Sequence, residues 1–215
     1  MVNIKYPWLK KYLDYFYTDK LAHSQLFSGK SGIGKSYFSL ELSKSLLCLN
    51  SSELFNYCGK CVSCNSFQSR THPDFKFIQP EDENKVIKIS QLRGNGKDKE
   101  NKGILNFLHE TPLISKSKII QISFAENMNA ESQNFLLKTL EEPSKNTYIF
   151  LTSSKPYLLQ PTLLSRLNHV SIHSPAKKEI SDWLKSINIK VDEKELNFLE
   201  DINPVSYTHL RAHET

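Results

Sequence analysis

Short apolar runs alternate along this chain with stretches whose apolar residues recur every three or four positions. The short runs have the length and composition of β-strands, and the periodic stretches are typical of amphipathic helices. The expected strands cover residues 24–28, 74–79, 118–123, 147–152 and 169–172. Strands that alternate with helices predict an α/β fold, in which a parallel sheet is flanked by crossover helices on both faces.

Two helix starts can be placed from their capping residues. Ser90 is expected to cap a helix that begins at Gln91, and Asn129 to cap one that runs from about Ala130 to Leu140. Both residue types accept hydrogen bonds from the first free N–H groups of a helix, which is why they are favoured at this position.

The pattern also predicts domain boundaries. Residues 1–174 form the α/β domain, and residues 175–204 begin a small helical domain that is still incomplete. Residues 205–215 continue no periodicity and resemble translated adapter or vector sequence, so we expect a non-native tail there and exclude it from fold reasoning. We therefore expect the natural protein to continue beyond this chain.

A glycine-rich loop stands between the strand 24–28 and the helix 37–47 and fits the pattern G-x-x-x-x-G-K-[ST]. Its residues are Gly29, Lys30, Ser31, Gly32, Ile33, Gly34, Lys35 and Ser36. Such a loop turns backbone N–H groups toward phosphate oxygens, its lysine adds positive charge, and its hydroxyl is suited to Mg²⁺. The strand, loop and helix order supports a phosphate-binding loop, and a chance glycine turn is the alternative.

Four cysteines, Cys48, Cys58, Cys61 and Cys64, have the spacing C-x9-C-x2-C-x2-C. Two intervening residues let neighbouring thiolates reach one ion from a tight turn, and four thiolates complete a tetrahedral shell without an open position. The spacing therefore predicts structural zinc. An iron–sulfur cluster and free buried thiols are the alternatives. His72 is a poorer ligand candidate, because four cysteines suffice and a turn into the next strand explains it.

Charge and hydropathy exclude few classes of function. Lys and Arg total 28 against 23 Asp and Glu, and the resulting net charge of +5 permits a nucleic-acid partner without requiring one. No run of 18 apolar residues predicts a membrane span, and lysines interrupt the apolar residues at the N-terminus where a secretory signal would be continuous. We expect a cytoplasmic protein, in which cysteines serve as metal ligands more often than in disulfides.

Three further motifs accompany the glycine loop and the cysteines, at residues 71–74 (Thr-His-Pro-Asp), 134–143 (Asn-Phe-Leu-Leu-Lys-Thr-Leu-Glu-Glu-Pro) and 163–166 (Leu-Leu-Ser-Arg). In this order and at this spacing, the set resembles the clamp-loader subunits of bacterial DNA polymerase III, which belong to the AAA+ class. The resemblance covers roughly residues 20 to 175. It implies an AAA+ domain with a zinc module inserted at about residues 48–64 and a helical lid after it.

The resemblance also separates the two kinds of subunit in this family. Its ATPase subunits carry Asp-Glu at the end of the strand before the Leu-Leu-Lys-Thr-Leu-Glu-Glu-Pro helix, where this chain has Ser123 and Phe124. Neither residue can hold Mg²⁺ or orient water as a carboxylate would. Glu126 is the nearest acid, but it lies beyond the expected strand end. The chain is thus similar to the delta-prime type, the non-hydrolysing stator; binding of ATP or ADP stays open and Mg²⁺ is doubtful.

Arg166 is the residue to which the resemblance assigns chemistry. It stands in Ser165-Arg166-Leu167, where the family has Ser-Arg-Cys and uses the arginine as a finger that reaches the γ-phosphate bound by a neighbouring subunit. A surface arginine near a helix end is the alternative. Ser153 and Ser154 occupy the place of the family's sensor residue, and a simple turn at the strand end explains them equally well.

The resemblance implies a hetero-oligomer as the setting. Its partners are the gamma/tau ATPase subunit and the delta subunit, with the sliding clamp and primer-template DNA reached through the complex. Two rival functions remain: an ATP-hydrolysing motor subunit, and a stand-alone zinc-containing P-loop protein that binds nucleic acid. The first needs an acid at position 123 or 124, and the second predicts a basic surface with exposed aromatic residues.

Overall fold

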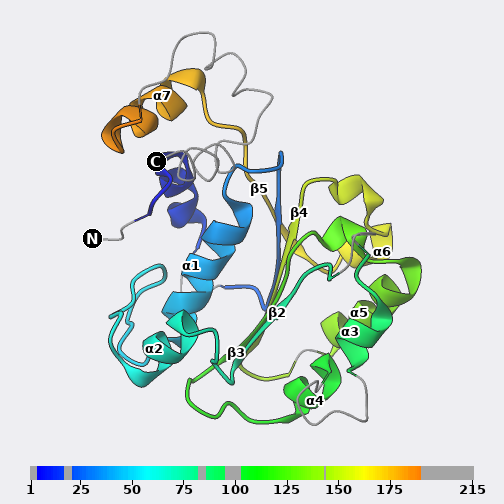
Figure 1. Ribbon diagram of the computed structural model, residues 1–215. Coiled ribbons are helices and arrows are strands. Elements are labelled where there is room, and N and C mark those ends of the chain that lie inside the picture. The colour runs from blue at the N-terminus through cyan, green and yellow to red at the C-terminus, as the bar shows by residue number, and fades with distance from the viewer. Residues whose placement is uncertain (1–3, 17–20, 82–85, 95–102, 143, 190–215) are drawn as a thin grey trace.

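The computed structural model describes residues 4–16, 21–81, 86–94, 103–142 and 144–189. Its centre is a sheet in the order β2-β3-β4-β1-β5, in which every pairing is parallel (Figure 1). The strands are β1 (Ser24–Ser28), β2 (Phe75–Ile78), β3 (Lys118–Ile122), β4 (Thr147–Ser153) and β5 (Asn168–Ser171). The predicted α/β class and parallel sheet are confirmed.

Helices cover both faces of the sheet. The α1 and α2 helices lie on one side, and α3 to α6 lie on the other (Figure 1). Their bounds are η1 (Pro7–Tyr15), α1 (Lys35–Leu47), α2 (Val62–Gln68), α3 (Ile89–Arg93), α4 (Ile104–His109), η3 (Ala125–Asn127), α5 (Ala130–Glu141), η4 (Pro156–Leu158), α6 (Pro161–Leu164) and α7 (Lys177–Ser186).

Two apolar cores follow from the alternation of side chains along the strands. Leu26 and Phe27 are neighbours in β1, yet Phe27 packs with Phe38 of α1 while Leu26 packs with Leu136 of α5. Successive strand residues point to opposite faces, so a central strand must be apolar on both. This explains why β1 and β3 are buried throughout, whereas the edge strands β2 and β5 keep exposed positions.

The capping residue of α5 was predicted correctly and that of α3 was not. Asn129 accepts a hydrogen bond from the Ser132 N–H at 2.8 Å, as a helix cap should. Ser90, in contrast, lies inside α3, which begins at Ile89. The side chain of Gln91 accepts the N–H of Lys88 at 2.9 Å, so the helix starts before the serine.

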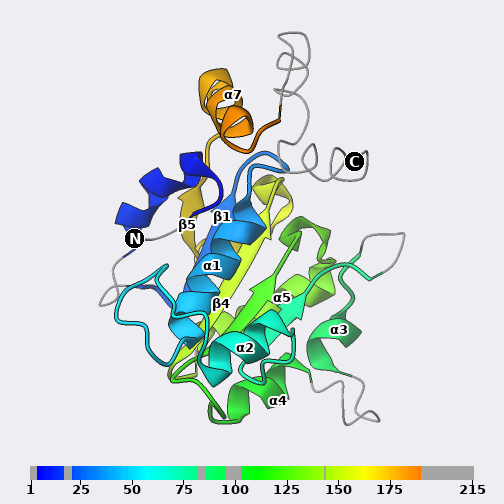
Figure 2. The ribbon, with the colours of Figure 1, turned by 60° about the vertical axis from the view of Figure 1, so that its left-hand side comes forward.

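An aromatic cluster joins the start of the chain to α7. The ring of Trp183 lies 5.3 Å from those of Tyr6 and Trp8, and the indole N–H of Trp8 donates to the Ile33 carbonyl at 2.8 Å. In Figure 2 the α7 helix, drawn in orange, lies above η1, which is drawn in dark blue. Residues 190–215 lie outside the described part, so the extent of a helical lid and the non-native tail stay predictions. Within the described part, no helix is long and apolar enough to cross a membrane.

Candidate functional site

The glycine-rich loop connects β1 to α1 and depends on backbone conformations that favour glycine. Gly29, Gly32 and Gly34 have φ angles of 145°, 70° and 95°. A Cβ atom on Gly29 would lie 2.1 Å from the Ile172 carbonyl oxygen, so the loop could not pass β5 with any other residue there. The sequence pattern therefore forms the turn that it predicts, and the N-terminus of α1 follows directly.

A cavity of about 180 Å³ lies over this loop, between α1 and the carboxyl ends of the strands. It is lined by Ser31, Gly32, Gly34, Lys35, Ser36, Tyr37, Phe124, Thr152, Ser153 and Ser154. Ser154 contacts Lys35, and Ser123 contacts Ser36, so the loop, the strand end after β3 and the expected sensor position come together. An anion here would meet the positive end of the α1 dipole, which suits a phosphate group.

The ammonium of Lys35 is engaged by its own chain. It donates to the carbonyls of Gly29 at 2.8 Å and Lys30 at 2.6 Å, and to the hydroxyl of Ser154 at 3.1 Å. These three acceptors match the three hydrogens of an ammonium, so a phosphate must replace at least one of them. Burial lowers the pKa of Lys35 to about 8, although the nearby charge of Glu126 opposes this shift.

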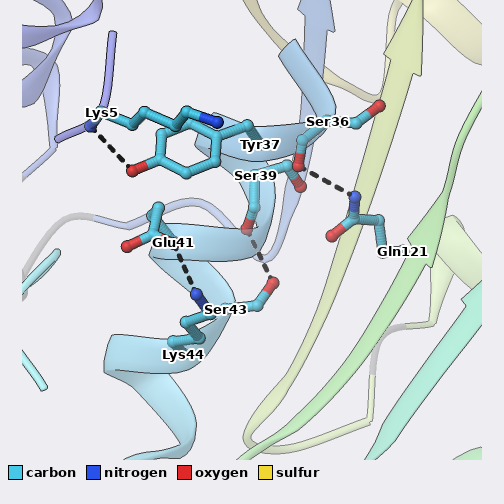
Figure 3. A network of polar contacts seen from close by, with 8 residues as sticks. All are labelled: Lys5, Ser36, Tyr37, Ser39, Glu41, Ser43, Lys44 and Gln121. Carbon is cyan, nitrogen blue, oxygen red and sulfur yellow. Dashed lines mark hydrogen bonds and ion pairs between the residues drawn. The ribbon is translucent and has the colours of Figure 1, made fainter. Parts of the chain in front are cut away.

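Two other hydroxyl groups lie next to that of Ser36, the last residue of the loop. The Ser36 hydroxyl lies 3.3 Å from the Ser123 hydroxyl and 3.4 Å from that of Thr152. The amide of Gln121 donates to the Ser36 carbonyl at 3.4 Å, which ties β3 to the first turn of α1 (Figure 3). Mg²⁺ prefers charged oxygen ligands, so this set of hydroxyls fits the metal poorly.

Glu126 lies closer to the loop than its sequence position indicates. Phe124 adopts a left-handed conformation with φ of 57°, and the short η3 turn then brings the chain back. One carboxylate oxygen of Glu126 accepts the N–H of Ser154 at 2.9 Å, and the other is buried without a hydrogen-bond partner among the described residues. No hydrogen bond joins this carboxylate to Ser36 in the described part of the chain. The sequence held no signal for this turn.

The four predicted cysteine ligands are brought together. The sulfurs of Cys48, Cys58, Cys61 and Cys64 all lie within 4.8 Å of one another, and those of Cys48 and Cys58 are 3.7 Å apart. Zinc–sulfur bonds of about 2.3 Å in a tetrahedron place two sulfurs about 3.8 Å apart, so the cluster fits zinc. Gly59, with φ of 69°, forms the turn between two of the ligands.

Backbone N–H groups stabilise the thiolate form of Cys58. Hydrogen bonds from the N–H groups of Lys60 and Cys61 lower the pKa of the Cys58 thiol to about 6. Burial acts in the opposite direction on Cys64, whose thiol pKa is raised. A bound cation would favour the thiolate at every ligand position, since the thiolate is the form that coordinates metal.

His72 and Asp74 form a buried structural hub, and neither belongs to the cysteine cluster found among the described residues. His72 Nδ1 accepts the N–H of Asp74 at 3.0 Å, so in the neutral ring the proton sits on Nε2, which lies 2.8 Å from the Ser63 hydroxyl. The carboxylate of Asp74 accepts three backbone N–H groups at 2.7 to 2.8 Å. The donors are Leu113, Ile114 and Ser115. The interpretation of His72 as part of a turn into the next strand is confirmed.

Because His72 is buried in this hub, we expect the free energy of unfolding to depend on pH. Burial lowers the pKa of His72, so the unfolded chain binds a proton more readily than the fold does. The free energy of unfolding should then decrease as the pH falls below about 6.5, the ordinary pKa of histidine. His72→Asn should reduce this slope, by at most about 1.4 kcal/mol per pH unit. Urea unfolding between pH 5 and 8 measures it.

The matched control for this prediction is His109→Asn, because His109 is an exposed histidine at the end of α4. It removes one imidazole without disturbing the hub. Acid would release a metal from the cysteines in both variants alike. The difference between their pH slopes therefore gives the contribution of His72 alone. Identical pH slopes in the two variants would contradict the prediction.

Arg166 follows α6 and lies outside the lining of the cavity over the loop. Its side chain is 37% exposed and forms an ion pair with Glu141 at the end of α5, at 2.7 Å. A second guanidinium nitrogen donates to the Thr162 carbonyl at 2.9 Å, and the Ser24 hydroxyl holds the Arg166 carbonyl at 2.9 Å. The hydrogen bond from Ser24 therefore holds the backbone of Arg166 in place, while its guanidinium lies at the surface.

Comparison with known proteins shows related sequences. The sequence profile of the family described as DNA polymerase III, delta subunit, matches residues 7–176. The chain is 32% identical over 163 residues to DNA polymerase III subunit delta' of Pseudomonas aeruginosa, covering 76% of this chain and 47% of that protein. It is 34% identical over 166 residues to the subunit delta' of Bacillus subtilis, covering 77% and 46%.

A gamma subunit is related as well. DNA polymerase III subunit gamma of Buchnera aphidicola is 29% identical over 191 residues, covering 86% of this chain and 49% of that protein. The chain thus spans about half the length of these curated relatives.

Proposed function

Because the chain belongs to the DNA polymerase III delta subunit family and is related to delta' subunits, we propose that it is a non-hydrolysing stator of a bacterial clamp loader. One observation carries the proposal: the hydroxyl of Ser36 meets only the hydroxyls of Ser123 and Thr152 among the described side chains. Without a carboxylate at this point, neither Mg²⁺ nor an attacking water would be held for hydrolysis.

Nucleotide binding belongs to the proposal, at the loop from Gly29 to Ser36. The glycine conformations and the start of α1 suit the phosphates of ATP or ADP. The ammonium of Lys35 would give up the carbonyls of Gly29 and Lys30 and bind these phosphates instead. Since that exchange costs hydrogen bonds already made, we expect weak binding that depends little on Mg²⁺. If the nucleotide is ATP, this chain would hold its γ-phosphate without cleaving it.

Zinc at Cys48, Cys58, Cys61 and Cys64 would act structurally. Cys48 follows α1, while Cys61 and Cys64 lie at the start of α2, so one ion would join two helices and the loop between them. Four thiolates leave no position for water, which excludes a hydrolytic role for an ion in this set.

Arg166 would carry the chemical contribution of the subunit. Its guanidinium is exposed at the surface and carries a permanent planar charge, which suits the oxygens of a phosphoryl group in transfer. The proposed recipient is the γ-phosphate bound by a neighbouring gamma/tau subunit. The delta subunit, the sliding clamp and primer-template DNA complete the proposed assembly.

The direct test is ATP hydrolysis by the isolated protein, with the Lys35→Ala variant as its background. We expect no turnover above that background, because nothing at Ser36 replaces the missing acid. Turnover that Lys35→Ala abolishes would contradict the stator and favour the motor function. A Glu126→Gln variant would then show whether the carboxylate beside Ser154 supplies it.

A further inference from the structure

The guanidinium of Arg166 is already paired within its own chain. Glu141 ends α5 and Arg166 follows α6, and their charged groups meet at 2.7 Å. We propose that Glu141 is a positioning residue that holds the guanidinium until a neighbour's phosphate takes its place. This inference rests on the proposed function, in which Arg166 acts on a neighbouring subunit.

The attachment of Arg166 allows such an exchange. Its carbonyl is held by the Ser24 hydroxyl at 2.9 Å, so the backbone can stay fixed while the side chain turns. Within the described part of the chain, the Nε–H of Arg166 has no acceptor, so one donor of the guanidinium is left for an incoming oxygen. The guanidinium can therefore meet a phosphate before it leaves Glu141.

The strengths of the two contacts set the direction of the exchange. The Arg166 side chain is 37% exposed and that of Glu141 is 52% exposed, so water screens their attraction. A phosphate carries more charge and can accept two parallel hydrogen bonds from a guanidinium. The phosphate should therefore displace Glu141. The carboxylate still competes with the phosphate for Arg166, and this competition should weaken phosphate binding by about 1.5- to 5-fold, as expected from the strength of other exposed ion pairs.

Glu141→Gln tests this competition, because glutamine keeps the shape and removes the charge. In a clamp loader reconstituted with this protein, the apparent KM for ATP at the site that Arg166 reaches, resolved by single-turnover kinetics of the DNA-bound complex, should fall by about 1.5- to 5-fold. The value of kcat should stay within about twofold, since the finger itself is unchanged. Higher ionic strength should shrink the difference, as expected for an exposed pair.

Glu142→Gln is the matched control, since it removes the same charge from the next residue, which is also exposed. We expect it to leave KM unchanged. The effect of Glu141→Gln should also vanish when Arg166→Ala is present, because only the pair couples the two positions. Equal effects of the two glutamine variants, an effect that persists without Arg166, or a fall in kcat would each overturn the exchange. If Arg166→Ala alone changes nothing, the proposed function fails as well, which separates the two failures.

Discussion

If Arg166 is the proposed finger, replacing it by alanine should slow hydrolysis at the one nucleotide site of the neighbouring subunit that it reaches. Arginine fingers supplied in trans contribute about 10³- to 10⁵-fold to phosphoryl-transfer rates, because the guanidinium stabilises charge that develops on the transferring oxygens. The sites served by other subunits should be unaffected, so the slow phase is best resolved by single-turnover kinetics of the DNA-bound complex. Assembly should persist, since the Arg166 backbone contact to Ser24 does not involve the side chain.

Two arginine substitutions sharpen this expectation. Arg166→Lys keeps the positive charge but loses the planar set of donors, so it should recover only part of the rate. Arg70→Ala removes an exposed arginine on the loop before β2, far along the chain from α6, and should leave the kinetics unchanged. An unaltered rate in an intact Arg166→Ala complex would remove this residue from the mechanism.

Removing the proposed zinc ion is expected to unfold the segment between α1 and β2. Structural zinc contributes about 10 to 16 kcal/mol of apparent binding free energy in small zinc domains, which sets an upper limit here. The cysteine cluster holds the end of α1 to the start of α2, and α2 is only seven residues long, so it should not persist without the ion. A chelator should lower the midpoint of thermal unfolding and reduce helical circular dichroism.

Cys58→Ser should reproduce the effect of the chelator, because this variant loses one ligand. His72→Asn should retain one zinc per chain, since His72 is committed to Ser63 and Asp74. Metal content is measured by elemental analysis of the purified protein. Loss of zinc in the His72 variant, or iron in place of zinc, would contradict the assignment.

Hydrophobic patterning predicted the order and type of elements well, because it follows from which faces must be buried. The buried strand at residues 118–122 and the capped start of α5 at Asn129 are examples. The grouping of the cysteines was equally accessible, since ligand spacing is a local property of the chain. These features depend on neighbours in sequence, which is the information that a single chain contains.

Contacts made by side chains from distant segments were not accessible in the same way. The return of Glu126 toward the loop depends on the left-handed conformation of Phe124, a residue type that rarely adopts it. The ion pair between Glu141 and Arg166 joins residues 25 positions apart. The buried role of Asp74 was hidden as well, because its three backbone partners lie about 40 residues further along.

Both tryptophans of the chain belong to the aromatic cluster between η1 and α7. The indole of Trp8 is bonded to the carbonyl of Ile33, within the glycine-rich loop, while Trp183 belongs to α7. Tryptophan emission, excited at wavelengths that tyrosine does not absorb, consequently originates from one place, beside the glycine-rich loop. Any rearrangement there on titration with nucleotide would be visible as a change in intensity or wavelength, with no dye attached.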